Sequence, residues 1–370
     1  MTAPGVRAPM LDLSSGQVLD PLAPPLRSAA LATAGAGPSP YAPRGGQPEL
    51  RRAVAELHAA RTGRAAGAEQ VVVTPGVRTA LFTAAAVVAR GRDVLVPAPH
   101  WSHYPRTLDL AGARMVPVPG DPADRRRVDV ATLEAARTTT TTTAAVLLTS
   151  PVNPSGAVLD RDRVRAIACW AAAAGLTVLV DDVYGAFAGA EDPLGATGPR
   201  TVVVGGVSKV HALAGLRVGW VVGPPDLSAE LDDVAEHVAG PVGTAAQSVA
   251  VAALAEPFRS RDVAGRVRRS AVALADATRL FRSVPGVDVV PADAGIYLCL
   301  SVARLLDARA FGAADDRALC AALADRTGVR MRAGSTFGMP AHLRLCVAAP
   351  PGVLAAAAER LRTHLHKFAG

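Results

Sequence analysis

The chain has 370 residues and a formal net charge of +7, and half of its residues are hydrophobic. This length favours about two domains, and the apolar content allows a sizeable core without disulfide or metal staples. The arginines are scattered over helical segments, and the densest cluster (124–129) has an acidic residue at each end. A solvated face therefore explains the charge better than nucleic-acid binding does.

Targeting and metal signals are missing from the sequence. The N-terminus shows no apolar signal segment, and no apolar run reaches the roughly 18 residues of a membrane span. The four cysteines form neither a CxxC pair nor a zinc pattern with histidine. We expect a cytoplasmic protein with no membrane partner, no disulfide framework and no metal site.

The first forty residues differ from the rest in composition. They carry seven of the 29 prolines, so we predict that residues 1–40 form an extended segment, which packs on the smaller of two domains.

Short apolar runs then alternate with longer helical segments from about residue 50 to 225. Each run is apolar nearly throughout, which fits strands that are buried on both faces. We predict a large α/β domain over residues 41–265 with a seven-stranded, mostly parallel sheet. Its strands are expected at 71–74, 93–99, 114–119, 144–151, 177–182, 201–206 and 217–223.

The pattern changes after about residue 225. A helix-rich stretch continues to about residue 281, and strand candidates follow at 287–292, 295–301 and 343–348, with helices between and after them. This favours a smaller α+β domain over residues 266–370.

Lys209 stands out because the only other lysine among the 39 basic residues is Lys367. It lies just after an apolar run that is predicted to be a strand. An amine can lose its proton and condense with an aldehyde, whereas a guanidinium effectively never loses its proton. The chemistry of an unprotonated amine would explain why this position is a lysine.

Several other polar or aromatic groups also lie just after predicted strands. Ligands of parallel α/β sheets bind beyond the carboxyl ends of the strands. Each group alone has an ordinary explanation as a turn, cap or core residue, but their joint placement indicates one site. The groups are the Pro75-Gly76 turn before Val77 and Arg78, then Trp101, Asn153, Asp181, Tyr184 and Lys209.

This set of groups suits pyridoxal phosphate, an aldehyde with a pyridine ring. Asp181 can keep the ring nitrogen protonated, and Asn153 and Tyr184 can donate to the 3'-oxygen. Trp101 can cover the ring face.

The phosphate of such a cofactor needs its own donors. It can lie at the helix start, on the backbone N–H groups of Val77 and Arg78. Arg217, eight residues after Lys209, can pair with it directly.

At this point the sequence resembles the fold-type I, pyridoxal-phosphate-dependent aminotransferases of classes I and II. The segment SKVHALAGLRVGW (208–220) resembles that family's lysine signature, SPVNPSG (150–156) its cofactor loop, and DDVY (181–184) its aspartate–tyrosine strand end. The resemblance extends over about residues 10–365. It implies an aspartate-aminotransferase-like fold.

The resemblance also implies roles for the individual residues. Lys209 would form the internal aldimine and move the proton, with Asp181 and Tyr184 completing the catalytic set. Arg344 would hold the substrate α-carboxylate, helped by Asn153 and the backbone near Gly16. The implied cofactor contacts are Val77, Arg78, Trp101, Asn153, Asp181, Tyr184, Lys209, Arg217 and, across a homodimer with composite sites, Tyr41.

A few positions depart from the family pattern. Gly206 replaces a residue that is often a phosphate-binding serine, Val152 replaces an asparagine, and Ala333 replaces a proline. Arg332, just before Ala333, is either a rim residue or a second anion site near the substrate.

We predict an aminotransferase that moves an amino group between an L-amino acid and a 2-oxoacid by a ping-pong mechanism. Alternatives on the same fold are a lyase, a decarboxylase, a cyclase or a histidinol-phosphate-type aminotransferase. A cofactor-binding regulatory module is a further alternative, but it would need a DNA-binding domain, for which we expect no room before residue 10. The motifs do not name the substrate side chain.

Overall fold

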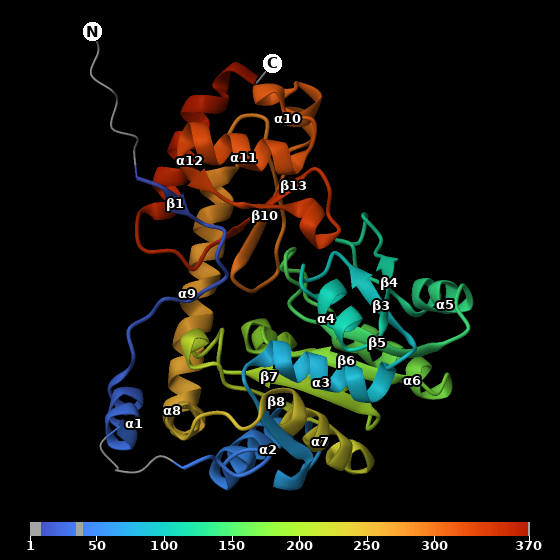
Figure 1. Ribbon diagram of the computed structural model, residues 1–370. Coiled ribbons are helices and arrows are strands. Elements are labelled where there is room, and N and C mark those ends of the chain that lie inside the picture. The colour runs from blue at the N-terminus through green and yellow to red at the C-terminus, as the bar shows by residue number, and fades with distance from the viewer. Residues whose placement is uncertain (1–8, 35–39, 369–370) are drawn as a thin grey trace.

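The seven apolar runs form one sheet in the computed structural model, which describes residues 9–34 and 40–368 (Figure 1). The strand order is β2-β8-β7-β6-β5-β3-β4. Strand β8 is antiparallel to both its neighbours, and the other pairs are parallel, which confirms the predicted fold class. The strands are β2 (Val71–Thr74), β3 (Asp93–Ala98), β4 (Arg114–Pro119), β5 (Thr143–Thr149), β6 (Thr177–Asp181), β7 (Thr201–Gly206) and β8 (Gly219–Val222).

Helices cover both faces of this sheet, as the apolar strands require. In β2, Val71 and Val73 pack into one core and Val72 into the other. The first core includes side chains of α2 (Pro48–Thr62), α5 (Val130–Thr138), α6 (Arg161–Ala173) and α8 (Thr244–Leu254). The second includes side chains of α3 (Val77–Ala89), α4 (Tyr104–Leu110) and α7 (Ser228–Ala239).

A smaller sheet forms the second part of the molecule. Its order is β12-β13-β10-β9, and all its pairs are antiparallel. A separate core lies between this sheet and its helices. The elements are β9 (Asp288–Val290), β10 (Tyr297–Ser301), α10 (Ala303–Asp307), α11 (Asp316–Thr327), β12 (Arg332–Ala333), β13 (His342–Cys346) and α12 (Val353–Leu365).

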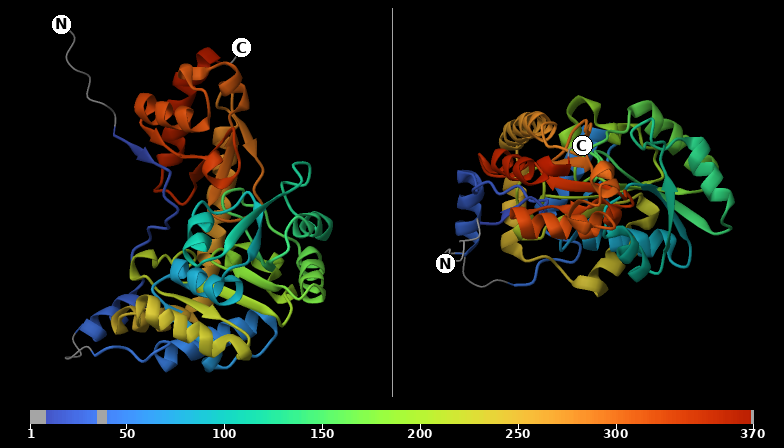
Figure 2. Two further views of the ribbon diagram at one scale, coloured as in Figure 1. Left: turned by 45° about the vertical axis from the view of Figure 1, so that its right-hand side comes forward. Right: turned by 90° about the horizontal axis from the view of Figure 1, so that it is seen from above.

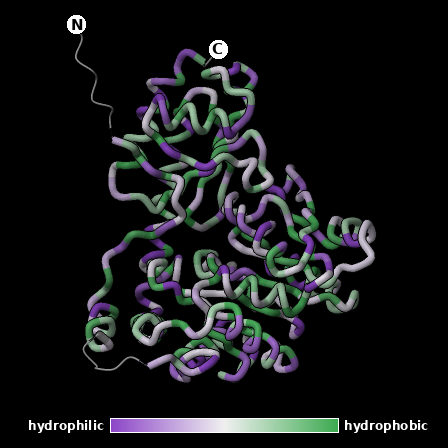
Figure 3. Tube along the Cα trace, viewed as in Figure 1, coloured by the Kyte–Doolittle hydropathy of each residue, from purple (hydrophilic) through white to green (hydrophobic). Residues whose placement is uncertain are grey.

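Helix α9 (Phe258–Phe281) joins the two parts, and Figure 2 shows it running from one into the other. The domain boundary expected between residues 265 and 266 falls inside this helix. Figure 3 shows hydrophobic residues gathered in the interior of both parts and hydrophilic residues on the outer helices.

The N-terminal segment differs in part from the expectation. Strand β1 (Leu11–Asp12) pairs with β11 (Val329–Arg330) of the small part. Residues Pro24–Ala34, however, form helix α1, and Leu26 is buried in the core of the large part. The two prolines at its start fit a first helical turn, whose N–H groups need no partner in the helix. Residues 1–8 and 35–39 of this segment lie outside the described residues.

In the part of the chain that the structure describes, no helix is both long and apolar enough to cross a bilayer.

Candidate active site

A cavity of about 520 Å³ lies between the two parts, at the carboxyl ends of β5, β6 and β7. This volume is in the range of small-molecule sites, roughly 300–1,000 Å³. Of the eleven residues that the sequence nominates, ten line it: Gly16, Val77, Arg78, Trp101, Asn153, Asp181, Tyr184, Lys209, Arg217 and Arg344.

Tyr41 is the nominated residue that does not line the cavity. Its side chain is 93% exposed, and it lies in the loop before α2. Within one subunit it has no place in the site.

Lys209 lies just after strand β7 and projects into the cavity. Its Nζ donates a hydrogen bond to the carbonyl of Gly16 at 2.5 Å and lies 5.9 Å from the ring centroid of Tyr184. Burial lowers the pKa of this amine, and the positive charges of Arg344 and Arg217 lower it further. An amine in this setting reaches the unprotonated, nucleophilic form more easily than a solvated lysine.

Asp181 ends strand β6 and is only 5% exposed. Burial raises its pKa to about 6. The Tyr104 hydroxyl donates to the carboxylate at 2.7 Å, and this hydrogen bond opposes the rise. A buried carboxylate of this kind gains from a cation beside it, as a protonated ring nitrogen would be.

The start of helix α3 forms an anion cradle. Its N-cap is Gly76, with φ 86° and no side-chain cap. The Thr79 N–H already donates to the Gly76 carbonyl, so the N–H groups of Val77 and Arg78 are the ones that can meet a ligand. A Cβ at Gly76 would collide with the guanidinium of Arg217. Arg217 itself has φ 55°, a strained conformation for a residue other than glycine.

The structure explains the glycine at position 206. A Cβ there would lie 2.7 Å from Cγ2 of Val77 and 2.8 Å from the carbonyl oxygen of Val218. A serine at this position would require the start of α3 to move.

Arg344, on β13, forms the opposite wall. It is 5% exposed and donates to Oδ1 of Asn153 at 3.1 Å and to the Ser14 carbonyl at 2.6 Å. Its guanidinium stacks on the rings of Tyr297 and Phe337, at 4.2 and 4.7 Å from their centroids. The buried Nε has no hydrogen-bond partner, so the guanidinium keeps a donor for a ligand.

Two tyrosines in the site were not nominated from the sequence. Tyr104 holds Asp181, and Tyr297 shares a hydrogen bond of 2.7 Å between hydroxyls with Tyr184. A Cβ at Gly16 would collide with the Tyr297 hydroxyl, so this tyrosine also explains the glycine. The signal was present, since the chain has only four tyrosines and both lie in short aromatic segments beside predicted strands, APHWSHYP and GIYLCL.

Trp101 lies at the mouth of the cavity among other rings. It meets His103 and Tyr104 edge-on, with centroids 4.8 and 5.6 Å apart. The guanidinium of Arg78 lies 5.5 Å from the Trp101 ring centroid. These contacts hold the indole in one orientation.

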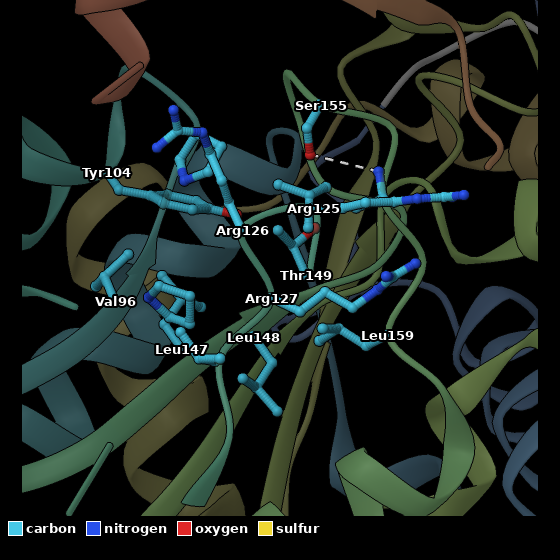
Figure 4. A pocket seen from close by; sticks show the side chains of 15 residues that line it. Val96, Tyr104, Arg125, Arg126, Arg127, Leu147, Leu148, Thr149, Ser155 and Leu159 are labelled. Carbon is cyan, nitrogen blue, oxygen red and sulfur yellow. Dashed lines mark hydrogen bonds between the residues drawn. The ribbon is translucent and has the colours of Figure 1, made fainter. Parts of the chain in front are cut away.

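A second cavity shares Tyr104 and Thr149 with the first, and Figure 4 shows the side chains that line it. Arg125, Arg126 and Arg127 also line it, but its volume is about 20 Å³. This is far smaller than the first cavity, and none of the residues nominated from the sequence lines it.

Comparison with known proteins gives the same result. A sequence profile of the aminotransferase class I and II family matches residues 8–361. The chain belongs to the aminotransferase class I and II family. It is therefore an enzyme, a pyridoxal-phosphate-dependent aminotransferase, and this confirms the predicted activity and cofactor.

Curated and solved members of the family share most of the chain. The aspartate aminotransferase of Streptomyces avermitilis is 34% identical over 83% of this chain and 77% of its own length. The arginine–pyruvate transaminase of Pseudomonas aeruginosa is 36% identical over 87% and 81%. The structure of Thermotoga maritima aspartate aminotransferase has a TM-score of 0.87, with 25% identity over 96% of this chain and 92% of that one.

Proposed function

We propose that the ten cavity residues carry out transamination in the roles that the family resemblance implies. The observation that carries this proposal is the position of Lys209. Its buried amine lines the cavity together with Asp181, at the end of the neighbouring strand, and with Arg344, from the opposite wall. A nucleophilic amine, an anion for a ring nitrogen and a cation for a carboxylate thus face one space of ligand size.

The cofactor fits the groups that are present. Asp181 would hold the ring nitrogen, Trp101 would cover the ring, and the cradle of Val77, Arg78 and Arg217 would hold the phosphate. When bound, pyridoxal phosphate supplies an aldehyde that takes up amines and a ring that draws electrons from the amino-acid Cα.

The remaining polar groups hold the 3'-oxygen. Burial keeps the pKa of the Tyr184 phenol well above its usual value, so this hydroxyl stays protonated and can donate. Asn153 lies beside Arg344, and its amide N–H₂ remains available as a second donor.

The protein's own part of the chemistry is positioning and proton transfer. Arg344 binds the α-carboxylate of the incoming amino acid and orients its Cα. Lys209, as an unprotonated amine at the cavity wall, would take the proton from the substrate Cα and give it back at the end of the transfer. Asp181, fixed by Tyr104, would keep a negative charge beside the ring nitrogen.

A second subunit completes the site in this proposal. Tyr41 is 93% exposed, which leaves its side chain accessible to a second subunit. A homodimer would bury Tyr41 and would bring it to the phosphate of the partner's site. We place the enzyme in the cytoplasm.

A donor and acceptor panel tests the proposed reaction. Purified enzyme with pyridoxal phosphate is incubated with single L-amino acids and with pyruvate or 2-oxoglutarate. We expect one new amino acid for each oxoacid released, and parallel lines in double-reciprocal plots. Release of carbon dioxide or ammonia without a new amino acid would instead indicate a decarboxylase or a lyase.

Subunit exchange tests the composite site. Lys209→Ala protein is mixed with Tyr41→Phe/Arg344→Ala protein, and cofactor retention is followed. In the mixed dimer, the site that keeps Lys209 receives an intact Tyr41 from its partner, so it should hold cofactor more tightly than in the doubly substituted homodimer. Equal retention, or a wild-type enzyme that is active and sediments as a monomer, contradicts the composite site.

A further inference from the structure

The cavity carries more positive charge than the cofactor and an α-carboxylate require. Its lining contains one carboxylate, Asp181, and five basic side chains: Arg78, Arg217, Arg332, Arg344 and Lys209. In the proposed function, the phosphate takes Arg217 and the backbone N–H groups of Val77 and Arg78, while the Arg78 guanidinium lies against the Trp101 ring. The α-carboxylate takes Arg344, and Lys209 acts as an amine. Arg332 is left without an anion.

Arg332 lies next to the guanidinium that binds the α-carboxylate. It is the antiparallel partner of Arg344 in the pairing of β12 with β13. Residues directly opposite each other share one face of the sheet, with Cβ atoms about 5 Å apart, and like charges in this arrangement repel. Both side chains line the cavity. The fold thus places two cations side by side at the substrate end of the site.

No protein group neutralises Arg332 among the described residues. Asp12, whose pKa its charge helps to lower, forms its ion pair with Arg330 at 3.6 Å. No hydrogen bond or ion pair engages the Arg332 side chain within the described ranges, 9–34 and 40–368. Burial lowers the pKa of the nearby His103, and the charges of Arg78 and Arg332 lower it further, so this imidazole adds no positive charge of its own beside Arg332.

We propose that Arg332 binds an anionic group at the far end of the substrate side chain. The substrates are then short amino acids with a second acidic group, a carboxylate or a phosphate monoester. Arg344 holds the α-carboxylate, and Arg332, on the neighbouring strand, holds the distal anion. The two paired arginines thus bind the two acidic ends of the substrate. The inference rests on the proposed function, because it takes Arg344 as the α-carboxylate site.

A binding experiment tests Arg332 without turnover. Succinate and butyrate, which carry no amine, are titrated into the cofactor-loaded enzyme by calorimetry. We expect the wild type to bind succinate at least tenfold more tightly than butyrate, and Arg332→Gln to lose this preference. Arg330→Gln is the matched control, because Arg330 is a nearby arginine that pairs with Asp12 and does not line the cavity.

The same variants are then compared as catalysts. The donors are L-aspartate, L-glutamate, O-phospho-L-serine, L-asparagine and L-alanine. Arg332→Gln should lower kcat/KM for the acidic donors by about 10–100-fold, the range for charge-assisted hydrogen bonds, and by less than threefold for the neutral ones. Arg332→Lys should recover part of the loss. The ratio of aspartate to phosphoserine turnover decides between carboxylate and phosphate.

The outcomes separate the two proposals. An equal loss for acidic and neutral donors, no loss at all, or succinate binding that survives Arg332→Gln overturns the role of Arg332 and leaves transamination intact. An enzyme that transaminates no donor overturns the proposed function, and the succinate titration still decides whether Arg332 binds a distal anion.

Discussion

The two walls of the cavity are built in different ways. The large-part wall consists of strand ends and one helix start, all held by a single sheet whose side chains are buried on both faces. The small-part wall is assembled from distant segments, since Arg344 on β13 donates to the Ser14 carbonyl, 330 residues away in sequence. One continuous sheet fixes the cofactor side, and several independent contacts fix the substrate side.

This difference suggests a division of labour, in which the large-part wall governs the chemical steps and the small-part wall governs the choice of substrate. The groups proposed to serve the cofactor lie where a shift of one strand would disturb the whole core, so they are rigidly placed. The groups proposed to face the substrate lie on β13, on the short edge strand β12 beside it and on the N-terminal segment. These can change without rebuilding the large sheet, which suits a family whose named members act on aspartate, asparagine or arginine. We therefore expect substitutions in the first wall to affect turnover and those in the second to affect substrate affinity.

The largest effect is expected at Lys209. Lys209→Ala should lower kcat by at least about 10³-fold, because the proton-transfer group is removed. Borohydride should no longer fix the cofactor to the chain. Lys367→Ala is the matched control, because it removes the only other lysine. Mass spectrometry after reduction should find cofactor on Lys209 in the control, and label on Lys367 in the wild type would refute the assignment.

Asp181→Asn should lower kcat by about 10²–10³-fold with cofactor still bound, because the ring nitrogen loses its counter-charge. Turnover close to that of the wild type would contradict this role. A neutral amide can still accept the Tyr104 hydrogen bond.

The same variant should be more stable than the wild type without cofactor. The pKa of Asp181 is about 6 in the fold, against 3.8 for the unperturbed group. The native state therefore binds more protons than the unfolded chain between these values, and stability falls as pH rises through this window. Two pKa units correspond to about 3 kcal/mol at most. Urea unfolding at pH 8 should give a larger free energy of unfolding for the variant than for the wild type. This difference should shrink as the pH is lowered towards 5.

Arg344→Lys probes the other wall. A lysine keeps the charge but loses the bidentate geometry, so KM should rise about 10–100-fold for every donor while kcat changes less. In this role Arg344 contacts only the α-carboxylate, which every amino donor carries, and not the donor's side chain. A change in KM confined to one donor would therefore contradict the role. Steady-state kinetics over the donor panel measures both quantities.

The smallest effects allow a direct comparison of the walls with one chemical change. Tyr104→Phe removes a hydrogen bond that lowers the pKa of Asp181, so its pKa should rise and the acid limb of the kcat profile should move to higher pH, with about tenfold lower activity at pH 6. Tyr297→Phe removes only the hydroxyl bonded to Tyr184. It should leave that limb in place and change kcat less than fivefold. Equal shifts in both variants would remove the distinction between the walls.

The sequence determined the cofactor side almost completely. Apolar strands buried on both faces can be recognised from their composition, and ligands of parallel sheets bind at the carboxyl ends of the strands. Lys209, Asp181, Asn153 and Trp101 could therefore be nominated from their positions at or just after the ends of these apolar runs. The lysine was recognisable because arginine fills nearly every other basic position.

Only the tertiary structure decided the substrate side. The packing of α1 against α8, the hydroxyl contact between Tyr184 and Tyr297, and the pairing of Arg332 with Arg344 depend on which elements meet in the folded chain. Such contacts join residues far apart in sequence, and no local periodicity or motif records them. A strand of two residues, like β12, leaves no pattern that could show which way Arg332 faces, and the neighbour across the sheet decides it.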